Sequence, residues 1–108
     1  MTKYRAKKTE IDGIKFDSKK EAKRYIVLKA LESKGEIKKL MLQPRFLLQE
    51  GFRKNGKAYR KIEYVADFMY EQDGKLIIED VKGMKTDVYK LKQKLFEKRY
   101  QDLTIKEI

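Results

Sequence analysis

The stretch from Ala66 to Gly83, ADFMYEQDGKLIIEDVKG, limits the possible folds of this chain more than any other. Its Asp73-Gly74 pair lies between two runs rich in apolar residues. This arrangement is typical of a β-hairpin with a type I′ turn, in which both central residues have positive φ. A two-residue turn places Asp67 directly opposite Asp80, although like charges at such cross-strand positions repel each other.

A cation must offset this repulsion if both carboxylates are ionised. Side chains alternate between the faces of a strand, so Asp80 and Lys82 share a face, and Asp67 joins it through the pairing. Lys82 alone could supply the positive charge, or a divalent metal could, since Mg²⁺ typically binds one or two carboxylates together with waters and a substrate phosphate. The alternative is a solvated face in which each acid pairs with one of the many lysines. A longer, bulged turn would move Asp67 to the opposite face.

The charge balance points to a polyanionic partner. The chain has 28 Lys and Arg residues against 17 Asp and Glu residues, a formal net charge of +11. Nucleic acid is the first candidate. A membrane surface is the second, and it is weaker because no apolar run is long enough to span a bilayer and no secretory segment follows Met1. A basic protein without such a partner is the remaining interpretation.

The chain contains no Cys and no His. It therefore has no disulfide, no zinc-thiolate site and no histidine general base. Hydrolytic chemistry would have to come from carboxylates, lysines and a metal. The composition is compatible with a reducing cytosol.

We expect a single domain over residues 1–108, because the only proline is Pro44 and no Ser/Gly-rich linker divides the chain. Residues 1–10 are basic and aperiodic, and we expect them to form a flexible arm. An Asp-Gly turn within residues 11–14 predicts a small hairpin leading to Phe16.

The sequence predicts two helices. The first follows Ser18, which with Glu21 forms a capping box, and it ends after Lys34 at Gly35. The second runs from Thr86 or Asp87 to Tyr100. Their expected apolar faces consist of Ala22, Tyr25, Ile26, Leu28 and Leu31 in the first helix, and Val88, Leu91, Leu95 and Phe96 in the second.

Strands are expected over residues 37–48, with a bend near Pro44, then over residues 59–70 and 76–81. Asn55-Gly56 is a suitable turn between the first two, and residues 103–105 suggest a last short strand. The resulting order is helix, three strands, helix, strand. This order predicts an α/β domain with a helix on each side of the sheet.

Asp67, Asp80 and Lys82, with a glutamate on a preceding helix, resemble the PD-(D/E)XK nuclease superfamily. The blocks FDSKKEAKRY, LQPRF, ADF and EDVKG are similar to those of small phage proteins related to phage endonuclease I and other Holliday-junction resolvases. The likeness extends from about Ile11 to Tyr100. It implies a restriction-endonuclease-like core, α-β-β-β-α-β, with a central mixed sheet flanked by helices.

The resemblance also implies roles for individual residues. Asp67 and Asp80 correspond to the metal-binding acids, and the main-chain carbonyl of Val81 to a further ligand. Lys82 corresponds to the catalytic lysine, which orients or activates the attacking water and stabilises developing charge. Glu21 corresponds to the helix glutamate that completes the metal site. As the third residue of a capping box, however, Glu21 would instead bond the backbone N–H at the helix start, so both interpretations stay open.

The sequence departs from the superfamily pattern in a few places. Ala66 replaces the proline of the motif, which carries no chemistry. Asp80 replaces the commoner glutamate and shortens the side chain by a methylene. The helical Gln-x-x-x-Tyr motif of some branches does not follow Lys82.

Basic residues on the two predicted helices would form a rim that grips phosphates. We expect DNA contacts from Lys19, Lys20, Lys23, Arg24, Lys85, Lys90 and Lys94, while a solvated helix face is the alternative for any single lysine. Gln43 is a candidate substrate contact, or else part of the edge structure. Tyr4, Tyr59 and Tyr89 could stack on bases, with packing as the alternative.

These features predict a Mg²⁺-dependent endodeoxyribonuclease, with Mn²⁺ as a substitute cofactor, that hydrolyses phosphodiester bonds. The resemblance implies branched DNA as substrate, a homodimer that makes two symmetric cuts, and the cytoplasm of a bacterial host if a phage encodes the protein. The alternative is a non-catalytic nucleic-acid-binding module on a nuclease fold. A structural or regulatory phage protein would leave the +11 charge unexplained.

Overall fold

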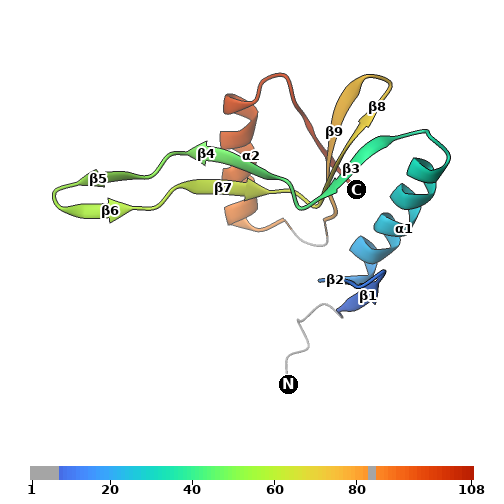
Figure 1. Ribbon diagram of the computed structural model, residues 1–108. Coiled ribbons are helices and arrows are strands. Elements are labelled where there is room, and N and C mark those ends of the chain that lie inside the picture. Colours follow the sequence, from blue (N-terminus) through green and yellow to red (C-terminus); the bar gives the residue numbers. More distant parts are fainter. Residues whose placement is uncertain (1–7, 83–84) are drawn as a thin grey trace.

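The computed structural model describes residues 8–82 and 85–108. Most of the predicted flexible arm, including Tyr4, lies outside these residues, as do Gly83 and Met84. The fold is α/β: a mixed sheet is flanked by helices α1 (Lys19–Ser33) and α2 (Asp87–Arg99) (Figure 1). Among the described residues, no helix is long and apolar enough to cross a membrane.

Within the described residues, the largest sheet has four strands in the order β10 (Ile105–Glu107), β9 (Lys75–Asp80), β8 (Phe68–Gln72) and β3 (Lys38–Leu42). Strand β10 runs parallel to β9, whereas the other neighbours are antiparallel.

The predicted register of the β8–β9 hairpin is confirmed. Phe68 pairs with Glu79, and Gln72 pairs with Lys75 across the two-residue turn. Asp73 and Gly74 have φ of 52° and 75°, as a type I′ turn requires. The bulged alternative, which would have moved Asp67 to the other face, does not occur at this turn.

The two longer strands that we expected are each divided by a corner. Strand β4 (Arg45–Gln49) follows Pro44, where a bend was predicted, and it pairs with β7 (Ile62–Val65). The continuous strand over residues 59–70 is wrong, because the chain turns at Ala66 and Asp67 before β8 begins. Backbone hydrogen bonds hold the corner: the Gln43 N–H donates to the Asp67 carbonyl at 3.0 Å, and the Ala66 N–H donates to the Pro44 carbonyl at 3.1 Å.

Beyond β4 and β7 the chain continues outward as a narrow two-stranded hairpin. Strands β5 (Phe52–Lys54) and β6 (Lys57–Tyr59) pair across the predicted Asn55-Gly56 turn, and Figure 1 shows them projecting away from both helices. The radius of gyration is 16.1 Å, above the value of about 13 Å for a compact domain of this length. The projection accounts for this elongated shape.

The amino-terminal hairpin consists of β1 (Thr9–Ile11) and β2 (Ile14–Phe16). Because β1 includes Thr9 and Glu10, the predicted arm extended too far into the fold. Helix α1 then begins as expected. The Ser18 hydroxyl accepts a hydrogen bond from the Glu21 N–H at 3.1 Å, and Gly35, with φ of 78°, follows the last residues of the helix.

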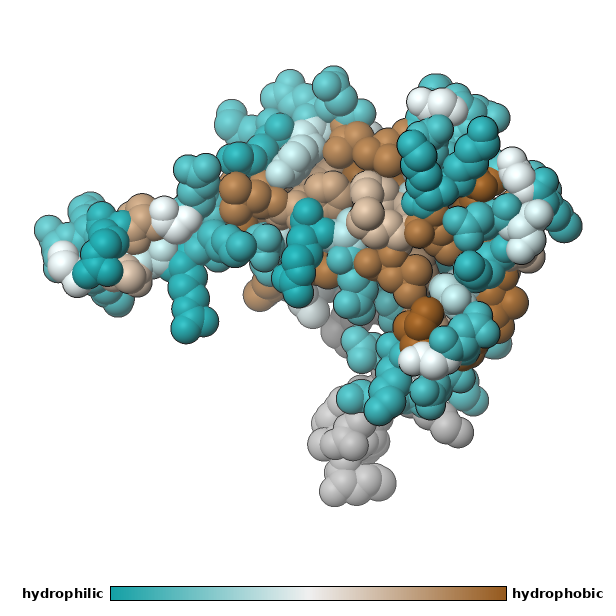
Figure 2. Space-filling model, in the orientation of Figure 1, coloured by the Kyte–Doolittle hydropathy of each residue, from teal (hydrophilic) through white to brown (hydrophobic). Residues whose placement is uncertain are grey.

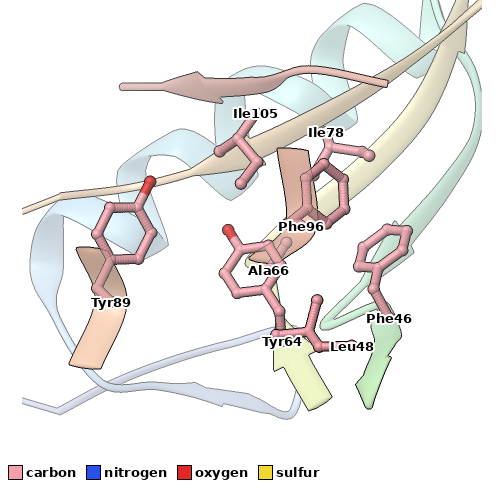
Figure 3. Packing of buried hydrophobic residues seen from close by; sticks show 8 residues of the cluster. All are labelled: Phe46, Leu48, Tyr64, Ala66, Ile78, Tyr89, Phe96 and Ile105. Carbon is pink, nitrogen blue, oxygen red and sulfur yellow. The ribbon is translucent and has the colours of Figure 1, made fainter. Parts of the chain in front are cut away.

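The apolar residues form two cores on opposite faces of the main sheet. The α2-side core contains Phe46, Leu48, Tyr64, Ala66, Ile78, Tyr89, Phe96 and Ile105, and Figure 3 shows how they pack. The α1-side core contains Phe16, Ala22, Tyr25, Leu28, Ile37, Phe68 and Tyr70. The expected placement of a helix on each side of the sheet is thus confirmed.

The predicted apolar faces of the helices need correction. Ile26 is 51% exposed in α1, and Val88 and Leu91 are 62% and 59% exposed in α2. In α2, Phe96 is buried as predicted and Leu95 packs against the α2-side core, while Tyr89, which was not predicted, is buried as well. The spacing of the aliphatic residues predicted Val88 and Leu91 as core, whereas the buried face of α2 passes through Tyr89 and Phe96.

Candidate functional site

A cleft of about 570 Å³ opens where the first turn of α1, the corner after β7, the end of β9 and the start of α2 meet. All four side chains for which the resemblance implied a catalytic role line this cleft, together with Val81: they are Glu21, Asp67, Asp80 and Lys82. The fold therefore brings together residues that lie up to 61 positions apart in the chain (82 − 21).

Asp67 lies at the corner between β7 and β8, half-buried beside Glu21. Its Oδ2 accepts a hydrogen bond from the Val81 N–H at 2.7 Å. Burial raises the pKa of Asp67 to about 8, and the Glu21 carboxyl, which is within hydrogen-bonding reach, adds to this rise; the Val81 N–H opposes it. The Asp67 carboxyl is therefore mostly protonated at neutral pH when no cation is bound.

Asp80, at the end of β9, is only 5% exposed. Its Oδ1 lies 2.8 Å from the Lys82 Nζ, and its Oδ2 accepts a hydrogen bond from the Tyr64 hydroxyl. Burial and this carboxylate both raise the pKa of Tyr64, so the phenol remains a hydrogen-bond donor. Of the alternatives considered for the acid pair, the solvated face is wrong for Asp80, because Lys82 and a buried tyrosine satisfy it.

The Lys82 ammonium group is held on two sides. Besides its ion pair with Asp80, Nζ lies 3.6 Å from the centroid of the Tyr89 ring, where the face of the ring attracts a cation. The Tyr89 hydroxyl donates a hydrogen bond to Glu107 at 2.7 Å, which fixes the ring. Tyr89 therefore has a packing role rather than the base-stacking role considered from the sequence. The roles of Tyr64 and Tyr89 depend on the fold and left no signal in the sequence.

The capping box at the start of α1 is only half formed. Ser18 caps the helix, but in the described part of the chain no hydrogen bond joins the Glu21 carboxylate to the Ser18 N–H. Glu21 is 7% exposed, and its carboxyl is directed to Asp67 instead. Of the two interpretations of Glu21, the structure thus favours a place in the acid cluster.

Glu21, Asp67 and Asp80 have the donor chemistry of a Mg²⁺ site, since Mg²⁺ prefers carboxylate oxygens and waters. Over residues 8–82 and 85–108, however, no group of three or more acidic side chains is close enough together to form a ready metal cluster. Asp80 is turned to Lys82 and Tyr64, while Asp67 is turned to Glu21 and Val81. The residues fit a cation by the chemistry of their donor atoms, because three carboxyl groups and the Val81 backbone line the same cleft.

A third buried acid, Glu79, was not singled out from the sequence. It points to the face opposite Asp80 and is 0% exposed. Arg24 binds both of its oxygens, with Nε at 2.7 Å and Nη2 at 2.5 Å, and the Tyr70 hydroxyl donates to it as well. Arg24, which we expected at the DNA rim, is therefore an internal ion-pair partner that joins α1 to β9.

The other predicted contact residues are divided between several surfaces. Lys20 lines the cleft, where its Nζ donates to the Lys82 carbonyl at 2.8 Å, and Lys92 of α2 lines it as well. Lys85 forms an ion pair with Glu107 at 2.8 Å. The remaining lysines are exposed: Lys19 and Lys23 beside β1, and Lys90 and Lys94 on α2.

Gln43 lies close to the acid cluster, as we expected. With Glu21 and Asp67 it lines a small hollow of about 170 Å³. Its φ of 52° belongs to the corner that follows β3.

The fold and the cleft together define an α/β domain with buried acids and a lysine at the end of a central strand. The chain belongs to a family described as a protein of unknown function (DUF1064), whose model matches residues 1–108. No curated protein and no solved structure matches the chain.

Proposed function

We propose that this protein is a metal-dependent DNA endonuclease that hydrolyses phosphodiester bonds, with a restriction-endonuclease-like core. One observation supports this proposal above all others: Glu21, Asp67, Asp80 and Lys82 come from separate elements and line one cleft. Packing alone gives no reason to bury several acids beside a lysine, because buried charges destabilise a fold unless they are paired.

A divalent cation, Mg²⁺ or Mn²⁺, would be held by Asp67 and Asp80, with Glu21 and the Val81 carbonyl as further donors. When bound, it supplies a polarised phosphate and a water of lowered pKa. Lys82 places its ammonium group beside the acids, where it stabilises negative charge that develops on the phosphate. The ring of Tyr89 and the carboxylate of Asp80 keep this group in position.

The charge around the cleft suits a nucleic-acid backbone. Lys20 and Lys92 line the same cleft, and the chain carries a net charge of +11. Such a field draws a polyanion to the site and accelerates its association. Branched, Holliday-junction-like DNA is the substrate that the sequence resemblance favours, and a homodimer would provide the two active sites for symmetric cuts.

A non-catalytic nucleic-acid-binding module is the second candidate, and the high positive charge supports it. The two functions differ in what they require of the acids. A pure binder gains nothing from Asp67 and Asp80 beside phosphates and would bind more tightly without them.

The test is cleavage of a synthetic four-way junction and of a matched linear duplex, each with Mg²⁺, Mn²⁺ or EDTA. We expect metal-dependent, paired nicks in the junction that are reduced at least ~100-fold by Asp80→Asn and by Asp67→Asn. Asp73→Asn is the matched control, because it removes an exposed acid from the turn of the same hairpin. Circular dichroism verifies that each variant is folded.

Equal cleavage of both DNAs would retain the nuclease and refute the preference for junctions. If the wild-type protein binds DNA but cuts neither substrate with either metal, the nuclease proposal fails. Tighter DNA binding by the acid variants would then establish the binding module.

A further inference from the structure

The projecting β5–β6 hairpin has an unusual composition. Residues 51–61, GFRKNGKAYRK, contain Arg53, Lys54, Lys57, Arg60 and Lys61 and no acid. We refer to these residues as the ribbon. All of them are exposed, and Figure 2 shows mainly hydrophilic side chains over the projection. A charged, protruding hairpin contributes little to the core, so its composition requires another explanation.

One face of the ribbon carries both aromatic and basic groups. Phe52 pairs with Tyr59 across the strands, and their rings stack with centroids 4.8 Å apart at an angle of 11°. These rings remain 46% and 40% exposed. Lys54 pairs with Lys57 next to the turn, and the alternation of side chains places both lysines on the same face as the rings. The Lys57 Nζ lies 5.2 Å from the centre of the Tyr59 ring.

The pairing of Lys54 with Lys57 is unfavourable by itself, because like charges directly opposite each other repel. Within residues 8–82 and 85–108, neither lysine forms an ion pair with an acid. Their neighbours are partly engaged: Lys61 lies 3.6 Å from Glu63, and Arg53 donates to the Gly56 carbonyl at 3.2 Å. Lys54 and Lys57 thus place two positive charges, without an acidic partner in the described part of the chain, on the face that carries the rings.

The dimensions of the ribbon match those of a DNA groove. Paired strands lie about 4.8 Å apart, and the major groove of B-DNA, about 12 Å wide, accepts a two-stranded β-ribbon. Asp67 follows Gly56 by eleven residues (67 − 56), which in extended conformation span at most about 36 Å. This length is close to one turn of duplex. A duplex held by the ribbon can therefore extend to the cleft.

We propose that the ribbon, residues 51–61, is a duplex-DNA-binding arm that lies in a groove and holds the helix beside the cleft. Lys54 and Lys57 contact phosphates, and the Phe52–Tyr59 pair packs against the sugars and base edges. A second copy of the chain is a poorer occupant, since the ribbon is basic and the whole chain carries +11. The inference shares the ligand with the proposed function but does not depend on the metal site.

The experiment measures binding of a fluorescent 20-bp duplex to the full chain in EDTA, where no cleavage takes place, over a series of salt concentrations. The test variant is Lys54→Gln/Lys57→Gln. The control, Lys75→Gln/Lys106→Gln, removes the same charge from exposed positions on the main sheet. Each phosphate contact contributes about 0.9 to the slope of log K against log salt. We therefore expect the test variant to lose about 1.8 from this slope and to bind at least ~10-fold more weakly than the control.

A test variant that matches the control in affinity and slope would overturn the proposal. A changed oligomeric state in size-exclusion chromatography, with the slope unchanged, would also overturn it and would assign the ribbon to contacts between copies. A larger loss for single-stranded DNA than for duplex would refute binding in a groove. Because the metal and the acids take no part in this measurement, it can succeed even if the protein proves to cut nothing.

Discussion

Asp67→Asn is expected to stabilise the metal-free protein at pH 8 and to leave its stability nearly unchanged at pH 4. Burial raises the pKa of Asp67 from 3.8 to about 8 in the folded protein. Between these values the folded state holds a proton that the unfolded state has lost, so stability falls as the pH rises from about 4 to about 8. An amide does not titrate, and its oxygen can still accept the Val81 N–H.

The size of the effect follows from the same shift. At about 1.4 kcal/mol per pKa unit, the full shift would correspond to about 6 kcal/mol. The Asp67 carboxyl is only half-buried, so solvent screening reduces the difference to about 2 kcal/mol. For a domain of this length, this amounts to roughly 10 °C in Tm.

The assay is urea unfolding at pH 4 to 8 in EDTA, followed by far-UV circular dichroism because the chain has no Trp. Asp73→Asn is the control: Asp73 is exposed, and its φ of 52° suits asparagine. If Asp67→Asn destabilised the protein equally at all pH values, or not at all, the argument from the buried carboxyl would be refuted.

In the same unfolding assay without EDTA, Mg²⁺ at about 100 times its Kd should stabilise the wild type by about 2.7 kcal/mol and the variant by less.

Three further changes test contacts elsewhere in the fold. Arg24→Met leaves the buried Glu79 carboxylate unpaired and should cost about 3–5 kcal/mol, and adding Glu79→Gln should recover most of this loss in urea unfolding. Tyr100→Phe removes a 2.7 Å hydrogen bond to the Leu47 carbonyl and should lower the free energy of unfolding by about 1 kcal/mol, as measured by thermal denaturation. Ser18→Ala removes the cap of α1 at a similar cost, and substitution by Gly should cost only a few tenths of a kcal/mol if the cap alone is responsible.

Local signals in the sequence predicted much of the fold. Asp-Gly and Asn-Gly turns, the Ser18 cap and Gly35 each act over a few residues, and the corresponding turns and helix ends all form. The corner at Ala66 was missed because backbone bonds to Gln43 and Pro44 cause it, and these residues are distant in the chain. The buried side of α2 was predicted only in part, with Leu95 and Phe96 but without Tyr89, because it depends on which aromatic rings fit the sheet.

The candidate site likewise contains some residues that the sequence predicted and others that it did not. The turn register and the alternation of the strand predicted that Asp67, Asp80 and Lys82 gather at one end of the hairpin, and the resemblance added Glu21. The direct pairing of Asp67 with Asp80 does not form, because the strand pairing ends at Phe68 and Glu79. Partners that meet only in the folded chain, such as Tyr64 with Asp80 or Arg24 with Glu79, could not be predicted, since no local pattern links them.

The two cores on opposite faces of the sheet have a consequence for how the domain opens. Each core is covered by a different helix, and only one layer of strands separates the two cores. Native proteins often unfold in such separate cooperative units. Arg24 ties α1 to β9, because releasing this helix breaks the ion pair with Glu79 and uncovers the α1-side core. Amide hydrogens of α1 and of β9 should therefore exchange with solvent together, through one shared opening event.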